Sequence, residues 1–114
     1  MAERTTTPKQ QTEARVREIL RSKHRNVSEK KMMGALAFMI DGAMCCSVRG
    51  DALLVRVTEE ERGELLSKPG VLPMKLGQRT MSGFVRVDPS ACRTEAALSK
   101  WLERGVLAAR AKTR

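Results

Sequence analysis

The chain has 114 residues, enough for one domain around a single core and too few for a second domain of ordinary size. It has no apolar run of about 18 residues that could span a bilayer, and residues 1–8 lack the apolar stretch of a secretory signal, so we expect a cytoplasmic protein without membrane contact. The formal charge of +9 points to anionic partners as a class and names none of them.

The excess of basic residues lies at the two ends of the chain. Residues 1–31 hold nine basic and four acidic residues, residues 32–99 hold eight of each, and residues 100–114 hold five basic and one acidic. Basic ends attract nucleic acid through a largely non-specific Coulomb term, and they also occur as solvated surface. The candidate nucleic-acid contacts are Arg15, Arg17, Arg21, Lys23, Arg25, Lys30, Lys31, Arg104, Arg110, Lys112 and Arg114.

Residues 1–11 are polar, rich in Thr and interrupted by Pro8, so we expect a disordered tail followed by one domain over residues 12–112. A first helix is predicted over residues 12–21, because Thr12 can act as N-cap and the apolar residues that follow have helical spacing.

Three strands are predicted next, as an antiparallel meander. The apolar run Met32–Ile40 ends at Asp41-Gly42, a pair typical of a type I′ hairpin turn. Residues 43–48 and residues 52–57 form the second and third strands.

Thr58-Glu59-Glu60-Glu61 has the pattern of a capping box at the start of a second helix, which Lys68-Pro69-Gly70 ends. The glutamates therefore have a structural explanation. Nothing near them in sequence supplies the base, Cys or His of a catalytic or metal site.

Residues 73–76 and 81–87 predict two further strands, and Thr94 caps a long final helix. The residues of this helix expected to face the sheet are Leu98, Trp101, Leu102, Gly105, Ala108 and Ala109.

The order of elements is α-β-β-β-α-β-β-α, without repeats or βαβ alternation. It predicts an α+β, two-layer fold with an antiparallel five-stranded sheet and helices on one face. An uncovered face or edge of this sheet would also allow two copies to form a homodimer. Two glycines are expected inside strands, Gly34 in the first and Gly83 in the last, where Gly83 indicates a bulge or a close approach by the final helix.

The sequence contains no recognised catalytic, cofactor-binding or metal-binding motif. The single histidine, His24, lies in a polar stretch and is expected on the surface. Cys45, Cys46 and Cys92 are expected to be reduced and buried, with a redox role as the alternative.

The methionines in or beside the predicted strands suit either a core or an adaptable binding surface, and core is the expected role. These residues are Met32, Met33, Met39, Met44, Met74 and Met81. The chain has only three aromatic residues, so an aromatic platform that stacks bases is not expected, and bound nucleic acid would be contacted at its phosphates.

A series of short motifs over roughly residues 14–110 resembles the N-terminal domain of the TfoX/Sxy group of competence regulators. The motifs are Lys30-Lys31-Met32-Met33-Gly34-Ala35-Leu36-Ala37-Phe38, Asp41-Gly42 with Met44, Asp51-Ala52-Leu53-Leu54-Val55-Arg56-Val57, Pro73-Met74 through Gly77-Arg79, Met81-Ser82-Gly83-Phe84-Val85-Arg86-Val87, and Trp101. Where the family usually has Met-Phe-Gly-Gly, this chain has Met32-Met33-Gly34-Ala35 and lacks the aromatic side chain. The resemblance implies a two-layer α+β fold and, for some members, a link to the regulation of competence genes. It implies no catalytic residue.

The favoured interpretation is a non-enzymatic regulatory or interaction domain with a protein or nucleic-acid partner and no cofactor. Non-specific binding of nucleic acid through the basic ends is the alternative. A thiol-based redox protein ranks last.

Overall fold

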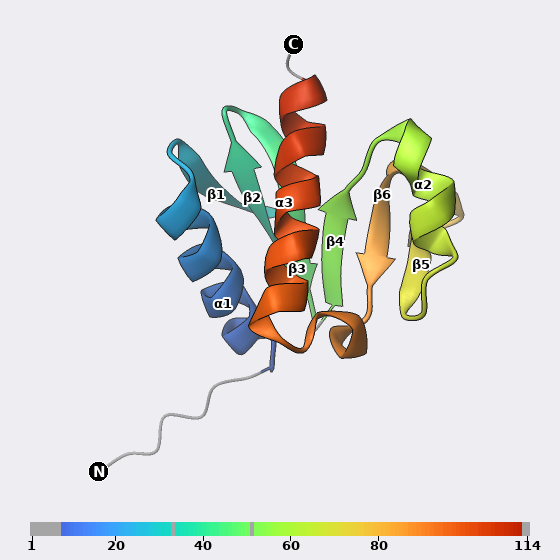
Figure 1. Cartoon of the computed structure of the whole chain (residues 1–114), viewed down its shortest axis with the longest axis horizontal. Coiled ribbons are helices and arrows are strands. Elements are labelled where there is room, and N and C mark those ends of the chain that lie inside the picture. Colours follow the sequence, from blue (N-terminus) through green and yellow to red (C-terminus); the bar gives the residue numbers. More distant parts are fainter. Residues whose placement is uncertain (1–7, 33, 51, 113–114) are drawn as a thin grey trace.

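The computed structural model describes residues 8–32, 34–50 and 52–112, and it shows an α+β fold with a single antiparallel sheet (Figure 1). In chain order the elements are α1 (Pro8–Lys23), β1 (Val27–Met32), β2 (Ala35–Ile40), β3 (Ala43–Arg49), β4 (Ala52–Arg56), α2 (Glu59–Leu66), β5 (Val71–Leu76), β6 (Arg79–Val87), the 3₁₀ helix η1 (Pro89–Cys92) and α3 (Glu95–Lys112). The strands follow the spatial order β1-β2-β3-β4-β6-β5. The predicted fold class is confirmed, but the sheet has six strands and not five.

The additional strand is β1, and it corrects the prediction of a single strand over residues 32–40. The chain turns between Met32 and Ala35, and Gly34 has a φ of 83° in this turn instead of lying inside a strand. β1 has the sequence VSEKKM and occupies an edge of the sheet. Its mostly polar side chains gave no apolar alternation, because an edge strand is paired and packed on one side only.

α1 begins at Pro8, four residues before the predicted start at Thr12. Proline suits the first turn of a helix, where its missing N–H would have no intrahelical acceptor. Residues 1–7 of the predicted tail lie outside the described residues.

The predicted hairpin turn and the N-caps of α2 and α3 are confirmed, whereas the N-cap predicted at Thr12 is wrong because Thr12 lies inside α1. Asp41 and Gly42 both have positive φ, of 51° and 86°, as a type I′ turn requires. Thr58 and Glu61 form the reciprocal capping box at the start of α2. At the start of α3, the hydroxyl of Thr94 accepts a hydrogen bond of 3.1 Å from the N–H of Ala97.

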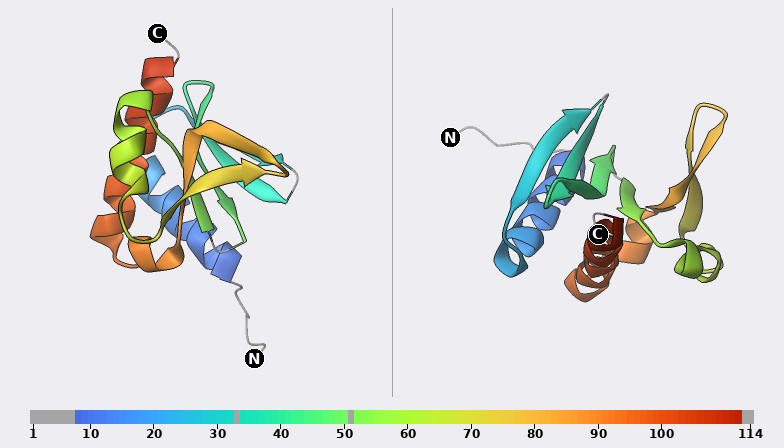
Figure 2. Two further views of the ribbon diagram at one scale, coloured as in Figure 1. Left: turned by 90° about the vertical axis from the view of Figure 1, so that its right-hand side faces the viewer. Right: turned by 90° about the horizontal axis from the view of Figure 1, so that it is seen from above.

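All three α-helices lie on one side of the sheet, with α3 crossing β3 and β4 (Figure 1; Figure 2). The six residues of α3 that were expected to face the sheet are all buried. The close approach is made by Gly105 and not by Gly83. A Cβ atom at position 105 would lie 2.4 Å from the carbonyl oxygen of Cys45, whereas one at position 83 would meet nothing within 4 Å.

Among the residues that the structure describes, no helix combines the length and the apolar character needed to cross a bilayer. The sheet is strongly bent, so that the β1–β2 side and the β5–β6 side rise around its centre (Figure 2). The concave side of this bend faces away from the helices.

Candidate functional site on the open face of the sheet

The pairing of the strands assigns each side chain to one of two faces, because directly paired residues share a face. One row across the whole sheet packs under the helices and consists of Lys31, Leu36, Val48, Leu53, Val87 and Val71. The neighbouring row points to the opposite side and consists of Lys30, Ala37, Ser47, Leu54, Arg86 and Leu72. We call the helix-free surface that contains this second row the open face.

The centre of the open face is buried although no helix covers it. Ala37, Ser47 and Leu54 are 0%, 4% and 4% exposed. Since all three α-helices lie on the other side of the sheet (Figure 2), neighbouring side chains of this face must cover these three residues. At the β5 end of the row, Leu72 remains 50% exposed.

In the strands that the structure describes, the charges on the open face are all of one sign. The six strands contain one acidic residue, Glu29, which lies on the helix side and is bonded to Arg17 of α1. Basic side chains, in contrast, recur at alternate strand positions that point to the open face. They are Lys30, Arg49, Arg56, Lys75 and Arg86.

Arg56 is fixed within this set. Its guanidinium lies over the ring of Phe84, 4.7 Å from the ring centroid, and its Nε donates a hydrogen bond to the carbonyl oxygen of Met44. Burial lowers the pKa of Arg56, yet a guanidinium keeps its charge in proteins. Because Arg56 occupies the ring and Phe84 is only 6% exposed, the one aromatic residue in the described strands of this face offers no free stacking surface.

A hollow of about 340 Å³ opens beside the buried floor. Arg49, Lys75 and Arg86 stand around it, and Leu54 and Met74 give it apolar walls. This combination of apolar surface and several convergent cations suits a partner group that carries both an acidic and an apolar part.

The methionines correct the expectation that they fill the core. None of the five that the structure describes in or beside the strands is fully buried. Met32, Met39 and Met44 belong to the open face by register, and Met74 lines its hollow. Flexible thioether side chains are common on surfaces that adapt to a partner. Met33 lies outside the described residues.

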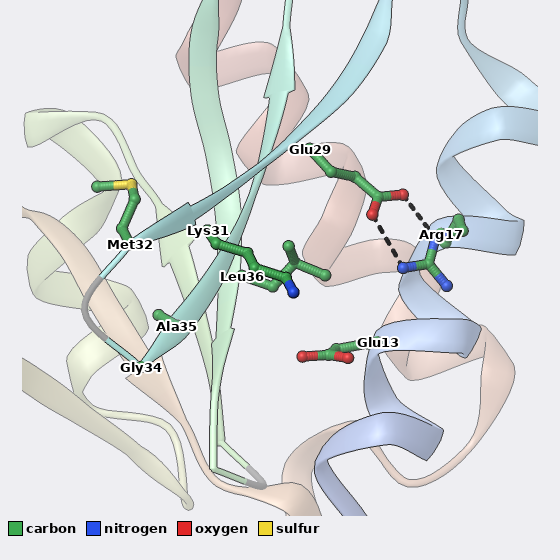
Figure 3. A pocket seen from close by; sticks show the side chains of 8 residues that line it. All are labelled: Glu13, Arg17, Glu29, Lys31, Met32, Gly34, Ala35 and Leu36. Carbon is green, nitrogen blue, oxygen red and sulfur yellow. Dashed lines mark hydrogen bonds and ion pairs between the residues drawn. The ribbon is translucent and has the colours of Figure 1, made fainter.

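Most of the cations proposed as nucleic-acid contacts already have partners within the molecule. Arg15 donates to the carbonyl oxygens of Cys92 and Arg93 at 3.3 and 3.0 Å. Arg17 and Arg21 share the carboxylate of Glu29 (Figure 3 shows Arg17), and Lys23 donates to Ser99 at 2.7 Å.

The other cations of that set are dispersed. Arg104 lies 3.8 Å from the carboxylate of Glu61 and over the ring of Trp101, and Arg110 lies 3.7 Å from Asp41. Arg25 is exposed in the turn after α1, and Lys30 is on the open face. The side chain of Lys112 and all of Arg114 lie outside the described residues. The structure thus gathers few of these side chains into one surface.

A second hollow, of about 350 Å³, lies between α1 and the β1–β2 turn. Glu13 and Arg17 on α1 face Glu29 and Lys31 on β1 across it (Figure 3). The hollow has two acidic and two basic side chains, and Arg17 and Glu29 are bonded to each other. Their hydrogen bond lowers the pKa of Glu29 and raises the pKa of Arg17. The ion pair between Arg17 and Glu29 thus links α1 to the sheet across this hollow.

The expectation that His24 lies on the surface is wrong. Its side chain is only 12% exposed, and its Nε2 lies 2.9 Å from the carboxylate of Glu103 in α3. The three cysteines are free and buried, as expected. The sulfur atoms of Cys45 and Cys46 lie 3.9 Å apart, and burial raises the pKa of the Cys92 thiol. Within the described residues, no three His, Cys, Asp or Glu side chains gather in a way that could hold a metal ion.

Sequence reasoning missed the basic residues of the open face, because residues 32–99 have no net charge. Four of the eight acidic residues of that segment lie in α2, whereas Arg49, Arg56, Lys75 and Arg86 lie in strands. The signal was present as period-2 alternation: Arg49 follows Ser47, and Arg56 follows Leu54, by two positions each.

Comparison with family models gives one finding: residues 18–109 match the model of the TfoX N-terminal domain. Comparisons with curated proteins and with solved structures gave no significant match. The matched region runs from within α1 to near the end of α3 and includes the whole sheet. The chain therefore belongs to the TfoX N-terminal domain family.

Proposed function

We propose that this protein is a non-enzymatic regulatory domain that acts by binding an anionic partner on the open face of its sheet. The observation that carries the proposal is the charge of that face: five basic side chains and, in the described strands, no acidic one. Membership of the TfoX N-terminal domain family supports a regulatory role.

The arrangement of the cations supports binding. Like charges held together on one surface repel each other, and an incoming anion relieves the repulsion. Arg49, Lys75 and Arg86 are exposed around a concave surface, where fields from several charges add.

The basic residues near the two ends of the chain are weaker candidates for binding an anionic partner than those of the open face. Phosphates that bind Arg15, Arg17 or Arg104 would first have to displace acceptors inside the molecule. A thiol-based activity also has weaker support, because Cys45, Cys46 and Cys92 are buried and thiol chemistry needs an accessible thiolate.

The proposal can be tested by adding poly-L-glutamate, a polyanion without bases, to the ¹⁵N-labelled protein and following amide chemical shifts. We expect shifts to concentrate at strand residues under the open face, such as Ala37, Ser47 and Leu54, and to weaken as salt is added. Shifts confined to α1 and α3, or none at low salt, would contradict the proposal.

Paired variants separate the face from the total charge. Arg49→Glu with Arg86→Glu alters the open face, and Arg25→Glu with Lys100→Glu makes the same change in net charge at exposed positions elsewhere. The first pair should abolish the shifts at strand amides, and the second should leave them in place.

A further inference from the structure

We infer that the occupant of the open face is an acidic amphipathic helix from a protein partner. This inference rests on the proposed function and narrows it, because the same cations could in principle meet a nucleic acid. Three properties of the face, taken in turn, select the helix.

The first property is the apolar surface between the charges. Leu72 is 50% exposed and Met32 41% exposed, and Met39, Met44 and Met74 are partly exposed. Phosphodiester strands have no group that gains from these contacts except their bases, which prefer aromatic or free guanidinium planes. Phe84 is covered by Arg56, so the described strands present no such aromatic plane here. Apolar side chains of a polypeptide suit this surface better.

The second property is the state of the strand backbones. The four inner strands are each paired on both sides, so the face presents side chains and few backbone groups. An extended peptide lying on such a face would bury its own N–H groups without acceptors, because Ser47 supplies the only hydroxyl in the central row. A helix, in contrast, satisfies its backbone hydrogen bonds internally.

The third property is the shape and distribution of charge. The floor is concave and low, with Ala37 and Ser47 at its centre, and cations stand on both sides of it: Lys30 on the β1 side, Lys75 and Arg86 on the β5–β6 side. A helix with an apolar stripe flanked by Glu or Asp would place the stripe on the partly exposed side chains of Met39, Met44 and Met74 around this buried centre, and its carboxylates against the cations. It would add a third layer to the fold, opposite α3.

A second copy of this chain is a weaker occupant. Two open faces brought together by a two-fold axis would place like charges against each other. A copy could instead offer α2, whose exposed side chains include Glu60 and Glu64, so self-association is one outcome that the experiment must detect.

The test uses three fluorescent probes with the intact protein: an 18-residue acidic peptide with apolar residues at i, i+3, i+4 and i+7, a scrambled peptide of the same composition, and a single-stranded 20-mer oligonucleotide. Anisotropy at two salt concentrations gives affinity, and circular dichroism gives helix content on binding. We expect the patterned peptide to bind at least about tenfold more tightly than its scrambled form and to gain helix. We expect Arg49→Glu with Arg86→Glu to remove at least about tenfold of this affinity, and Arg25→Glu with Lys100→Glu to leave it within about threefold.

The alternative outcomes are separable. Equal binding of both peptides means that charge alone is recognised. Tighter binding of the oligonucleotide means that the partner is a nucleic acid. Either outcome overturns the inference of a helical partner and leaves the proposed function standing. Failure of all three probes overturns both. Sedimentation velocity at the concentrations used detects self-association of the protein. If the protein self-associates and Glu60→Lys with Glu64→Lys abolishes that self-association, the occupant of the open face is α2 of a second copy and not the helix of a partner. Melting curves establish that each variant is folded, and Lys75→Glu provides a second reversal of charge at the same hollow.

Discussion

Gly105 is the residue where the two layers of the fold come closest. It lies in the middle of α3, where glycine normally costs stability, and the contact with the carbonyl oxygen of Cys45 explains its presence. The opposing atom belongs to the backbone of β3, so a larger side chain cannot be accommodated by a change of rotamer.

We therefore predict that Gly105→Ala destabilises the protein by about 1–3 kcal/mol, the range for overpacking of a well-packed core. Gly63→Ala is the matched control, because Gly63 is also helical and a Cβ there would meet nothing within 4 Å. This control should be neutral or more stable by up to about 1 kcal/mol. Chemical denaturation of both variants measures the difference, and equal effects would disprove the close contact.

A second prediction at the residue scale concerns Glu29. Its pKa is lowered in the folded protein, first by the hydrogen bond with Arg17. The carboxylate therefore stabilises the fold above the ordinary Glu pKa of about 4.3, and this contribution is lost as the pH falls through the lower pKa of the folded state.

Glu29→Gln should reduce the free energy of unfolding at pH 7 by less than about 1 kcal/mol, because Arg17 is partly exposed and solvent screens the pair. Denaturation of both proteins across pH 2–7 checks this: the difference should vanish towards pH 2. A constant difference at all pH values would assign the effect to packing instead of charge.

At the scale of elements, α2 depends on the cap at its N-terminus for stability. It has eight residues, too few for a helix to be stable in isolation, and Leu65 is the residue that it buries fully. The capping box formed by Thr58 and Glu61 satisfies backbone groups at the N-terminus that would otherwise have no partner.

Thr58→Ala should accordingly cost about 0.5–2 kcal/mol, the usual range for loss of an N-cap. Thr58→Ser keeps the hydroxyl and should recover most of the loss. Thermal unfolding distinguishes the two, and equal melting temperatures for the Ala and Ser variants would show that the cap does not stabilise α2.

The strands show how far the element pattern could be predicted. β2 to β6 were found from sequence because they contain apolar runs and are bounded by turn residues such as Asp41-Gly42, although β5 begins at Val71, two residues before its predicted start. β1 was missed because it contains Glu29, Lys30 and Lys31 in six residues, and its strand conformation comes from pairing with β2. Local preference could not indicate it, since the pairing partner supplies the stabilisation.

At the scale of the whole molecule, the two faces of the sheet differ in charge. Glu29 and the glutamates of α2 lie on the helix side, and Arg49, Arg56 and Arg86 of β3, β4 and β6 lie on the other. A protein that keeps unpaired cations together gives up some stability for a binding surface.

This separation predicts that Arg49→Gln with Arg86→Gln raises the melting temperature at low salt by about 1–4 °C, through relief of like-charge repulsion. At about 1 M salt the gain should disappear, because the screening length falls to about 3 Å. Arg25→Gln with Lys100→Gln, outside the open face, should give a smaller change. A loss of stability at low salt in the open-face variant would mean that these arginines have structural partners.

The sequence by itself determined the fold class, most of the strands, the N-caps of α2 and α3 and the buried stripe of α3, because each depends on residues close together in the chain. It also supported assignment to the TfoX family. Only the tertiary structure decided which cations are free. Arg17 and Glu29, or Arg104 and Glu61, are neighbours only after folding, and the cations of Arg49, Lys75 and Arg86 meet because three strands from different parts of the chain share one concave face. A net charge summed along the chain cannot distinguish these cases, since the energy of a charge depends on what lies within a few ångströms of it in space.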